Sequence, residues 1–207
     1  MKLNVDRIDS THSEFPQALN STEFFQLWLI GRSDLLNERL VGLFCSAKCP
    51  GEVILKTYDV IRAIRDAGVA MIGGFHSPME KECLQLLLRG EQPVVICPAR
   101  EVQYMRLPFA WRDAIEAKRA LVISPFDSRH RQPTAELSER RNDLVGRLAE
   151  RFFVPHAEPA SKTARLCSQL ISHGKVVLTL DTHANDHLLH VGANVVRDDN
   201  VVDSLSS

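Results

Sequence analysis

The sequence contains no hydrophobic run long enough to cross a membrane, and its longest apolar stretches have the length of β-strands. Residues 1–15 lack the apolar core of a signal peptide. Aromatic residues are also scarce, at 6% of a 207-residue chain that is 44% hydrophobic, which is an ordinary composition for an α/β domain. We therefore expect one domain with a full core, no secretory leader and no membrane partner.

Cysteine is sparse, and its number is odd. The five residues, scattered over predicted strands and helices, are Cys45, Cys49, Cys83, Cys97 and Cys167. This pattern is typical of reduced thiols, so we expect a cytoplasmic protein. No second cysteine pair follows Cys45-x3-Cys49, and His183-x3-His187 has no third ligand at a defined spacing. We expect neither a metal nor a cofactor.

The chain has no excess of positive charge, since its net charge is -1 and its pI is about 6.7. This balance excludes a global attraction to nucleic acid, so any such binding needs a local basic patch. Arginines are concentrated between residues 100 and 151, and the densest group is Arg129, Arg131, Arg140 and Arg141. Two interpretations stay open for this group: a solvated helix face, or a shared site for an anion.

A βαβ unit stands at the centre of the chain. The apolar runs Val69–Ile72 and Val94–Cys97 predict two buried strands. Between them, Ser77 is placed to cap a helix, and Glu80 follows at the spacing of a capping box. A right-handed crossover of this kind implies a parallel sheet with any ligand at the carboxyl ends of its strands.

Further elements follow from the same reasoning. We expect strands at 40–45, 120–124, 152–156, 176–180 and 194–196, and helices at 24–28, 52–67, 99–105, 108–118, 134–150, 161–173 and 182–190. The sequence thus predicts an α/β fold with a Rossmann-like, doubly wound, mostly parallel sheet of six or seven strands. We expect a flexible N-terminal arm at 1–20, a single domain at 21–197 and an acidic, disordered tail at 198–207.

The turn Gly73-Gly74 enters the predicted helix directly, but it is neither a GxGxxG motif nor a Walker loop. A structural turn is therefore the first interpretation, although the helix N-terminus makes an anion site physically easy. Lys162 and Thr163 open another predicted helix, where they either contact an anion or form a solvated first turn. Ser46 also precedes a helix, and without a GxSxG motif we interpret its hydroxyl as a cap or a phosphate contact.

Several segments occur in a particular order along residues 28–192. They are Trp28-Leu-Ile-Gly-Arg, the turn at 45–48, Ile72-Gly-Gly-Phe-His-Ser-Pro-Met-Glu80, Ser124-Pro-Phe, Arg140-Arg-Asn-Asp-Leu-Val-Gly146 and Ser161-Lys-Thr-Ala164. In this order they resemble the motifs of the DNA-processing protein A (DprA/Smf) family. Three departures are clear: Cys45-Ser46-Ala47 replaces that family's Gly-Ser-Arg, Glu80 stands where the family has Asp, and Pro125 stands where it has Glu.

The resemblance implies a Rossmann-like core that binds single-stranded DNA in a basic pocket at the carboxyl ends of the strands, in DNA uptake or recombination. It also implies a homodimer and a RecA-type recombinase as partner. Lys48 lies one residue from the position of the missing family arginine. The residues expected to contact DNA or a nucleotide are Ser46, Lys48, Gly73, Gly74, Phe75, His76, Ser77, Glu80, Arg129, Arg131, Arg141, Asn142, Lys162 and Thr163.

Two other functions are compatible with the same pocket. A sensor or carrier of a single nucleotide, in the same Rossmann-like superfamily, agrees with the near-neutral charge and the loss of the turn arginine. A nucleotide-cleaving enzyme would use Glu80 as acid or base, but the sequence places no partner residue beside it. The Pro-Gly-Gly-x-Gly-Thr motif of lysine-decarboxylase-like enzymes is absent. We therefore expect a binding protein without catalytic activity.

Overall fold

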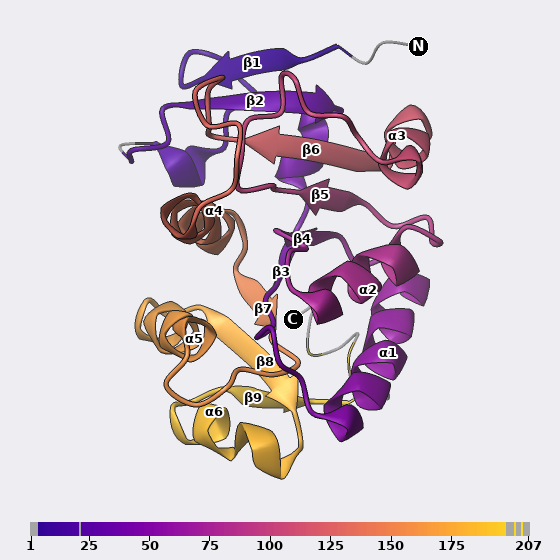
Figure 1. Cartoon of the computed structure of the whole chain (residues 1–207), viewed down its shortest axis with the longest axis vertical. Coiled ribbons are helices and arrows are strands. Elements are labelled where there is room, and N and C mark those ends of the chain that lie inside the picture. The colour runs from indigo at the N-terminus through magenta and orange to yellow at the C-terminus, as the bar shows by residue number, and fades with distance from the viewer. Residues whose placement is uncertain (1–3, 21, 198–200, 202–203, 205–207) are drawn as a thin grey trace.

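The computed structural model describes residues 4–20, 22–197, 201 and 204. These residues form one mixed sheet with helices on both faces (Figure 1). The strands are β1 (Asp6–Asp9), β2 (Gln26–Gly31), β3 (Val41–Leu43), β4 (Met71–Gly73), β5 (Val94–Ile96), β6 (Ala120–Ser124), β7 (Arg151–Phe153), β8 (Val176–Leu180) and β9 (Asn194–Val196). The α-helices are α1 (Gly51–Asp66), α2 (Pro78–Leu87), α3 (Phe109–Glu116), α4 (Ala135–Leu148), α5 (Lys162–Ser172) and α6 (Asp186–His190).

The strand order is β1-β2-β6-β5-β4-β3-β7-β8-β9. Strands β3 to β9 are parallel to one another, whereas β2 pairs antiparallel with β6, and β1 antiparallel with β2. Because β3 lies between β4 and β7, the direction of winding reverses at β3. The predicted doubly wound, mostly parallel α/β sheet is therefore confirmed, with nine strands in the described residues in place of six or seven.

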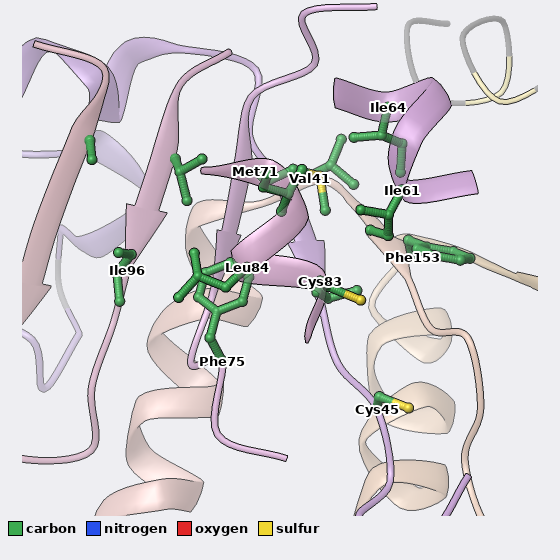
Figure 2. Packing of buried hydrophobic residues seen from close by; sticks show 14 of the residues in the cluster. Val41, Cys45, Ile61, Ile64, Met71, Phe75, Cys83, Leu84, Ile96 and Phe153 are labelled. Carbon is green, nitrogen blue, oxygen red and sulfur yellow. The ribbon is translucent and has the colours of Figure 1, made fainter. Parts of the chain in front are cut away.

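The sheet is buried on both faces, as a doubly wound fold requires. Helices α1, α2 and α3 cover one face, and α4, α5 and α6 cover the other (Figure 1). Side chains along each strand alternate between the two layers, so that Met71 packs under α1 and α2 while Ile72 packs under α4. Figure 2 shows part of the first layer, including Val41, Ile61 and Met71. Full burial of one such side chain stabilises the fold by about 1.5–3 kcal/mol.

Helix caps form where the sequence indicates them. Ser77 accepts a hydrogen bond from the Glu80 amide at 3.3 Å, and the Glu80 carboxylate completes the capping box. The Thr134 hydroxyl accepts from the Leu137 amide at 3.1 Å, and Ser161 caps α5 in the same way. These local signals place the starts of α2, α4 and α5 within one residue of the predicted positions.

The N-terminal part of the chain differs from the prediction. In place of a flexible arm, Asp6–Asp9 form the edge strand β1, and Ile8, Phe15 and Leu19 are buried. A short 3-10 helix, η1 (Gln17–Leu19), precedes β2, and a second one, η2 (Ser33–Asn37), follows it. The apolar residues before Leu19 are too far apart to show the periodicity of a helix or a strand. This segment therefore takes its structure from contacts with segments distant in sequence, such as the pairing of β1 with β2.

Two predicted helices are wrong. Residues 26–31 form strand β2, because four consecutive residues, from Leu27 to Ile30, are buried between β1 and β6. A buried strand and a buried helix cannot be distinguished by periodicity in so short a run. Residues 99–105 form turns and not a helix.

The predicted disordered tail at 198–207 lies outside the described residues, except for Val201 and Ser204. Val201 is buried against the first core layer, and the Ser204 carbonyl accepts a hydrogen bond from Arg151 at 2.9 Å. No helix among the described residues combines the length and the hydropathy that crossing a bilayer needs.

Candidate functional site

The diglycine turn at the end of β4 is packed against an arginine from α4. Arg141 is 5% exposed, and a Cβ placed on Gly74 would lie 1.3 Å from its Nη1 atom. The same guanidinium donates to the Cys97 carbonyl at 3.2 Å and to Asn142 Oδ1 at 2.7 Å. Gly74 is therefore required for space, because its missing side chain admits the guanidinium to the carboxyl end of the sheet.

The residue after the turn has an unusual backbone. Phe75 has a φ of 47°, although it is not a glycine, and its ring is 4% exposed within the first core layer. A left-handed conformation costs roughly 1–2 kcal/mol for such a residue, so the ring's burial must offset it. The turn is consequently held in one shape before any ligand arrives.

Glu80 holds this region together from within. Its buried carboxylate accepts backbone hydrogen bonds from Cys45 at 2.9 Å, His76 at 2.7 Å and Ser77 at 3.2 Å. These bonds tie the segment after β3 to the turn after β4. These bonds also engage the carboxylate oxygens of Glu80 that acid or base chemistry would need. In addition, they occupy the amides of His76 and Ser77, which could otherwise have bound an anion.

An open groove begins at this turn and runs between α2 and α3. Its volume is about 700 Å³, within the range of roughly 300–1,000 Å³ that small-molecule sites occupy. The lining residues are Gly74, Phe75, His76, Lys81, Leu84, Gln85, Leu88, Arg89, Pro98, Ala99, Arg100, Pro108, Ala110, Trp111, Pro133 and Arg141. None of these described residues is an Asp or a Glu, whereas four are Lys or Arg. The groove, called the α2–α3 groove below, therefore combines apolar walls with one sign of charge.

One arginine in the α2–α3 groove keeps an unsatisfied donor. The Nε atom of Arg100 is buried and has no hydrogen-bond partner among the described residues. Its Nη2 lies 3.4 Å from Oε1 of Glu101, whose side chain is fully buried. A buried donor without an acceptor costs about 1–3 kcal/mol.

Other predicted cations lie outside this groove. Arg129 is 82% exposed at its side chain and forms an ion pair with Asp127 at 2.6 Å, which lowers the pKa of Asp127 to about 2 through hydrogen bonding from Arg129. Arg131 instead lies 5.3 Å from the centre of the Tyr104 ring. The predicted arginine group is thus divided, since Arg141 alone of its members lines the α2–α3 groove in the described part of the chain.

A second groove of about 550 Å³ lies between α4 and α5. Asn142 and Lys162 line it, but so do Glu139, Asp143 and Arg165, so its charges are mixed. The Lys162 ammonium pairs with Glu139 at 2.6 Å. Thr163, in the first turn of α5, is half-buried and does not line either groove.

The reversal point between β3 and β7, where doubly wound sheets commonly bind ligands, is bridged by the protein itself. The Ser46 amide donates to the His156 carbonyl at 3.0 Å, and the Ser46 hydroxyl accepts from the Glu158 amide at 2.9 Å. Ser46 is 5% exposed, whereas Lys48 is exposed and does not line the α2–α3 groove. The accessible space is therefore displaced toward β4 and β5.

Sequence reasoning did not select Lys81, Arg89, Arg100 or Trp111. Lys81 and Arg89 are eight residues apart, which places them on one helical face and could have suggested a basic strip. Neither Trp111 nor Arg100 has a local sequence signal of a binding site. Among the described residues, no group of three or more His, Cys, Asp or Glu could hold a metal ion.

The sequence pattern of the family described as DNA recombination-mediator protein A matches residues 7–204. The chain belongs to this family. The resemblance to DprA/Smf proteins is thereby confirmed over nearly the whole sequence. No curated protein matches the chain.

Solved structures agree with the fold of the DNA recombination-mediator protein A family. DNA processing protein A (DprA) from Streptococcus pneumoniae superposes with a TM-score of 0.81 at 17% identity, covering 97% of this chain and 74% of that one. DNA processing protein A from Helicobacter pylori, described with a unique single-stranded DNA binding mode, gives 0.78 at 16% identity, covering 99% and 96%. The molybdenum cofactor carrier protein of Chlamydomonas reinhardtii gives 0.57 at 11% identity, covering 82% and 97%.

Proposed function

We propose that this chain is a DprA/Smf-like DNA-processing protein that binds single-stranded DNA in the α2–α3 groove, without catalysis, in DNA uptake or recombination in the cytoplasm. The observation that carries this proposal is the lining of the groove, in which four residues are cationic, several are apolar and none of the described residues is an Asp or a Glu. Family membership and the DNA-binding description of the Helicobacter pylori relative support the same ligand.

The lining suits the two parts of a nucleotide. Lys81, Arg89, Arg100 and Arg141 would neutralise phosphates. Trp111, with the apolar residues around it, offers a surface on which a base can stack. Of the residues selected from the sequence, Gly74, Phe75, His76 and Arg141 would shape the inner end of this site.

The remaining selected residues take other roles in this proposal. Gly73, Ser77 and Glu80 would position the turn through buried backbone contacts, since Ser77 and Glu80 form the capping box. Ser46 would hold the two central loops together. Lys48 and Arg129 would add exposed charge to the same end of the sheet, and Asn142, Lys162 and Thr163 would lie on its far side, near the α4–α5 groove.

Fluorescence anisotropy with labelled oligo-dT at two salt concentrations tests this site. We expect binding that weakens as salt rises, because each neutralised phosphate releases counterion. The variant Lys81→Gln/Arg89→Gln should bind more weakly and with a smaller salt slope, by about 1.4 for two contacts on a single strand. Arg62→Gln is the matched control, because Arg62 is exposed on α1 and pairs with Asp59 at 2.8 Å. Equal affinity of both variants and the wild type would contradict the proposed site.

A sensor or carrier of one nucleotide is the second candidate. The volume of the groove, and the hydrogen bonds that bridge the neighbouring reversal point, favour a compact ligand. A mononucleotide that binds tightly raises the melting temperature by mass action. Thermal melting with single nucleotides and with oligomers therefore separates the two candidates. A nucleotide carrier should show its full rise in melting temperature with the mononucleotide, whereas a strand-binding protein should need the oligomer.

The family resemblance also implies a homodimer, and we propose one for this chain. Light scattering after size-exclusion chromatography gives the mass in solution and tests this proposal directly. A RecA-type recombinase stays a prediction that pull-down with the purified recombinase can test.

A further inference from the structure

Two exposed aromatic residues follow β5: Tyr104 lies in the connection to α3, and Phe109 is the first residue of α3. Tyr104 is 69% exposed and Phe109 is 75% exposed. Phe109 lies between Pro108 and Ala110, which both line the α2–α3 groove. Single exposed hydrophobic residues are normal on a protein surface, so exposure alone does not indicate a site.

Each ring carries an arginine on one face. The Arg131 guanidinium lies 5.3 Å from the centre of the Tyr104 ring, and that of Arg112 lies 5.9 Å from the centre of the Phe109 ring. Neither guanidinium forms an ion pair with a carboxylate of the described residues, in contrast to Arg129, which is paired with Asp127. Both residues nevertheless remain largely exposed to solvent.

Hydrogen bonds to Glu101 hold the connection that carries Tyr104 in place. The buried carboxylate of Glu101 accepts a hydrogen bond from the Tyr104 amide at 2.8 Å. The Glu101 amide in turn donates to the His130 carbonyl at 2.9 Å, next to Arg131. Through its carboxylate and its backbone amide, Glu101 thus joins the segment that carries the ring to the segment that carries the arginine, which reduces the ordering cost of a contact there.

We propose that Tyr104 and Phe109 form a stacking rim that carries bases of a single strand beyond the α2–α3 groove, with Arg131 and Arg112 contacting the adjacent phosphates. This inference rests on the proposed function and extends it from a pocket to a path along the surface. Open aromatic faces bind bases without sequence preference, and neighbouring cations bind the backbone between them. An acidic peptide would satisfy the arginines but would leave the flat rings without a matching partner.

Anisotropy titrations with a short oligo-dT of about four nucleotides and a longer one of about sixteen separate the groove from the rim. For Tyr104→Ala/Phe109→Ala we expect at least about tenfold weaker binding of the longer oligomer. Binding of the short oligomer should stay the same, and the salt slope should also stay the same because no phosphate contact is removed. Tyr104→Trp/Phe109→Trp should restore the affinity.

The arginine variant has a different signature. Arg112→Gln/Arg131→Gln should reduce the salt slope for the longer oligomer by about 1.4, for two phosphate contacts. Phe25→Ala is the matched control for the aromatic variant, because Phe25 is 67% exposed and does not line the groove. Circular dichroism melting shows that each variant is folded.

The outcomes distinguish the rim from the groove. If the wild type binds both oligomers with a salt slope and the aromatic variant binds the longer one equally well, the rim is wrong and the groove proposal stands. If the wild type binds neither oligomer, both proposals are overturned.

Discussion

The guanidinium of Arg141 occupies the space that a side chain at Gly74 would need, with Nη1 only 1.3 Å from the place of a Cβ atom. This pair joins α4 to the end of β4, across 67 residues of sequence, and it closes the inner end of the α2–α3 groove.

Gly74→Ala should displace Arg141 and destabilise the fold by about 1–3 kcal/mol, as overpacking does. The displaced guanidinium would lose its bond to the Cys97 carbonyl, which holds it at the inner end of the α2–α3 groove. The variant should therefore also bind oligo-dT less well. Urea unfolding measures the first effect and anisotropy the second. Gly51→Ala is the control, since nothing lies within 4 Å of a Cβ at that position, and an equal loss in both variants would contradict the packing argument.

Glu80→Gln should reduce the free energy of unfolding by about 2 kcal/mol, because an amide can no longer accept from all three backbone donors. The two amides on Oε2, from His76 and Ser77, would meet an NH2 group or lose their acceptor. Glu82→Gln, on an exposed position of the same helix, should change stability little. Equal midpoints in urea for the two variants would show that the Glu80 bonds are unimportant.

Stability should depend on pH through Asp127. Hydrogen bonding from Arg129 lowers the pKa of Asp127 to about 2 in the folded protein, below the value of about 3.9 in an unfolded chain. The stabilisation is therefore complete above about pH 4 and is lost as the pH falls toward 2. For this partly exposed pair we expect less than about 1 kcal/mol. Asp127→Asn should remove that part of the acid dependence, which thermal melting between these pH values can follow.

Cys49 should react first with an alkylating reagent. Hydrogen bonding from the Cys45 thiol lowers the pKa of Cys49, which is half-buried, while it raises that of Cys45. Burial raises the pKa of both Cys97 and Cys167 to about 12. Because the thiolate is the nucleophile, iodoacetamide at mildly alkaline pH should modify Cys49 well before the others. Peptide mass spectrometry measures the order, and early labelling of Cys97 would refute this assignment.

Much of the fold could be predicted from short-range patterns. The caps at Ser77, Thr134 and Ser161 and the apolar runs of β5, β6 and β8 depend on neighbours within a few residues, so the sequence shows them directly. Strand β2 could not be predicted in this way, because an all-apolar run has no period and its type depends on β1 and β6 beside it.

The candidate site could likewise be predicted only in part. The glycine turn and the arginines could be selected from their positions in the chain, and Arg141 does lie over Gly74. Which cations share a groove could not be predicted, since Arg129 is bound to Asp127 and Lys162 to Glu139. Lys81 on α2 and Arg89 in the turn after α2 line the α2–α3 groove instead. The nearest opposite charge decides this, and whether it comes from the same loop, as Asp127 does, or from another helix, as Glu139 does, depends on the fold.

Local spacing and the order of motifs were enough to predict the family, the doubly wound order of β3 to β9 and the starts of α2, α4 and α5. The tertiary structure alone decided that the reversal point is bridged by Ser46 and that the acid-free space lies between α2 and α3. Hydrogen bonds and ion pairs between remote segments set both outcomes, and their energies depend on distances that the order of residues does not contain.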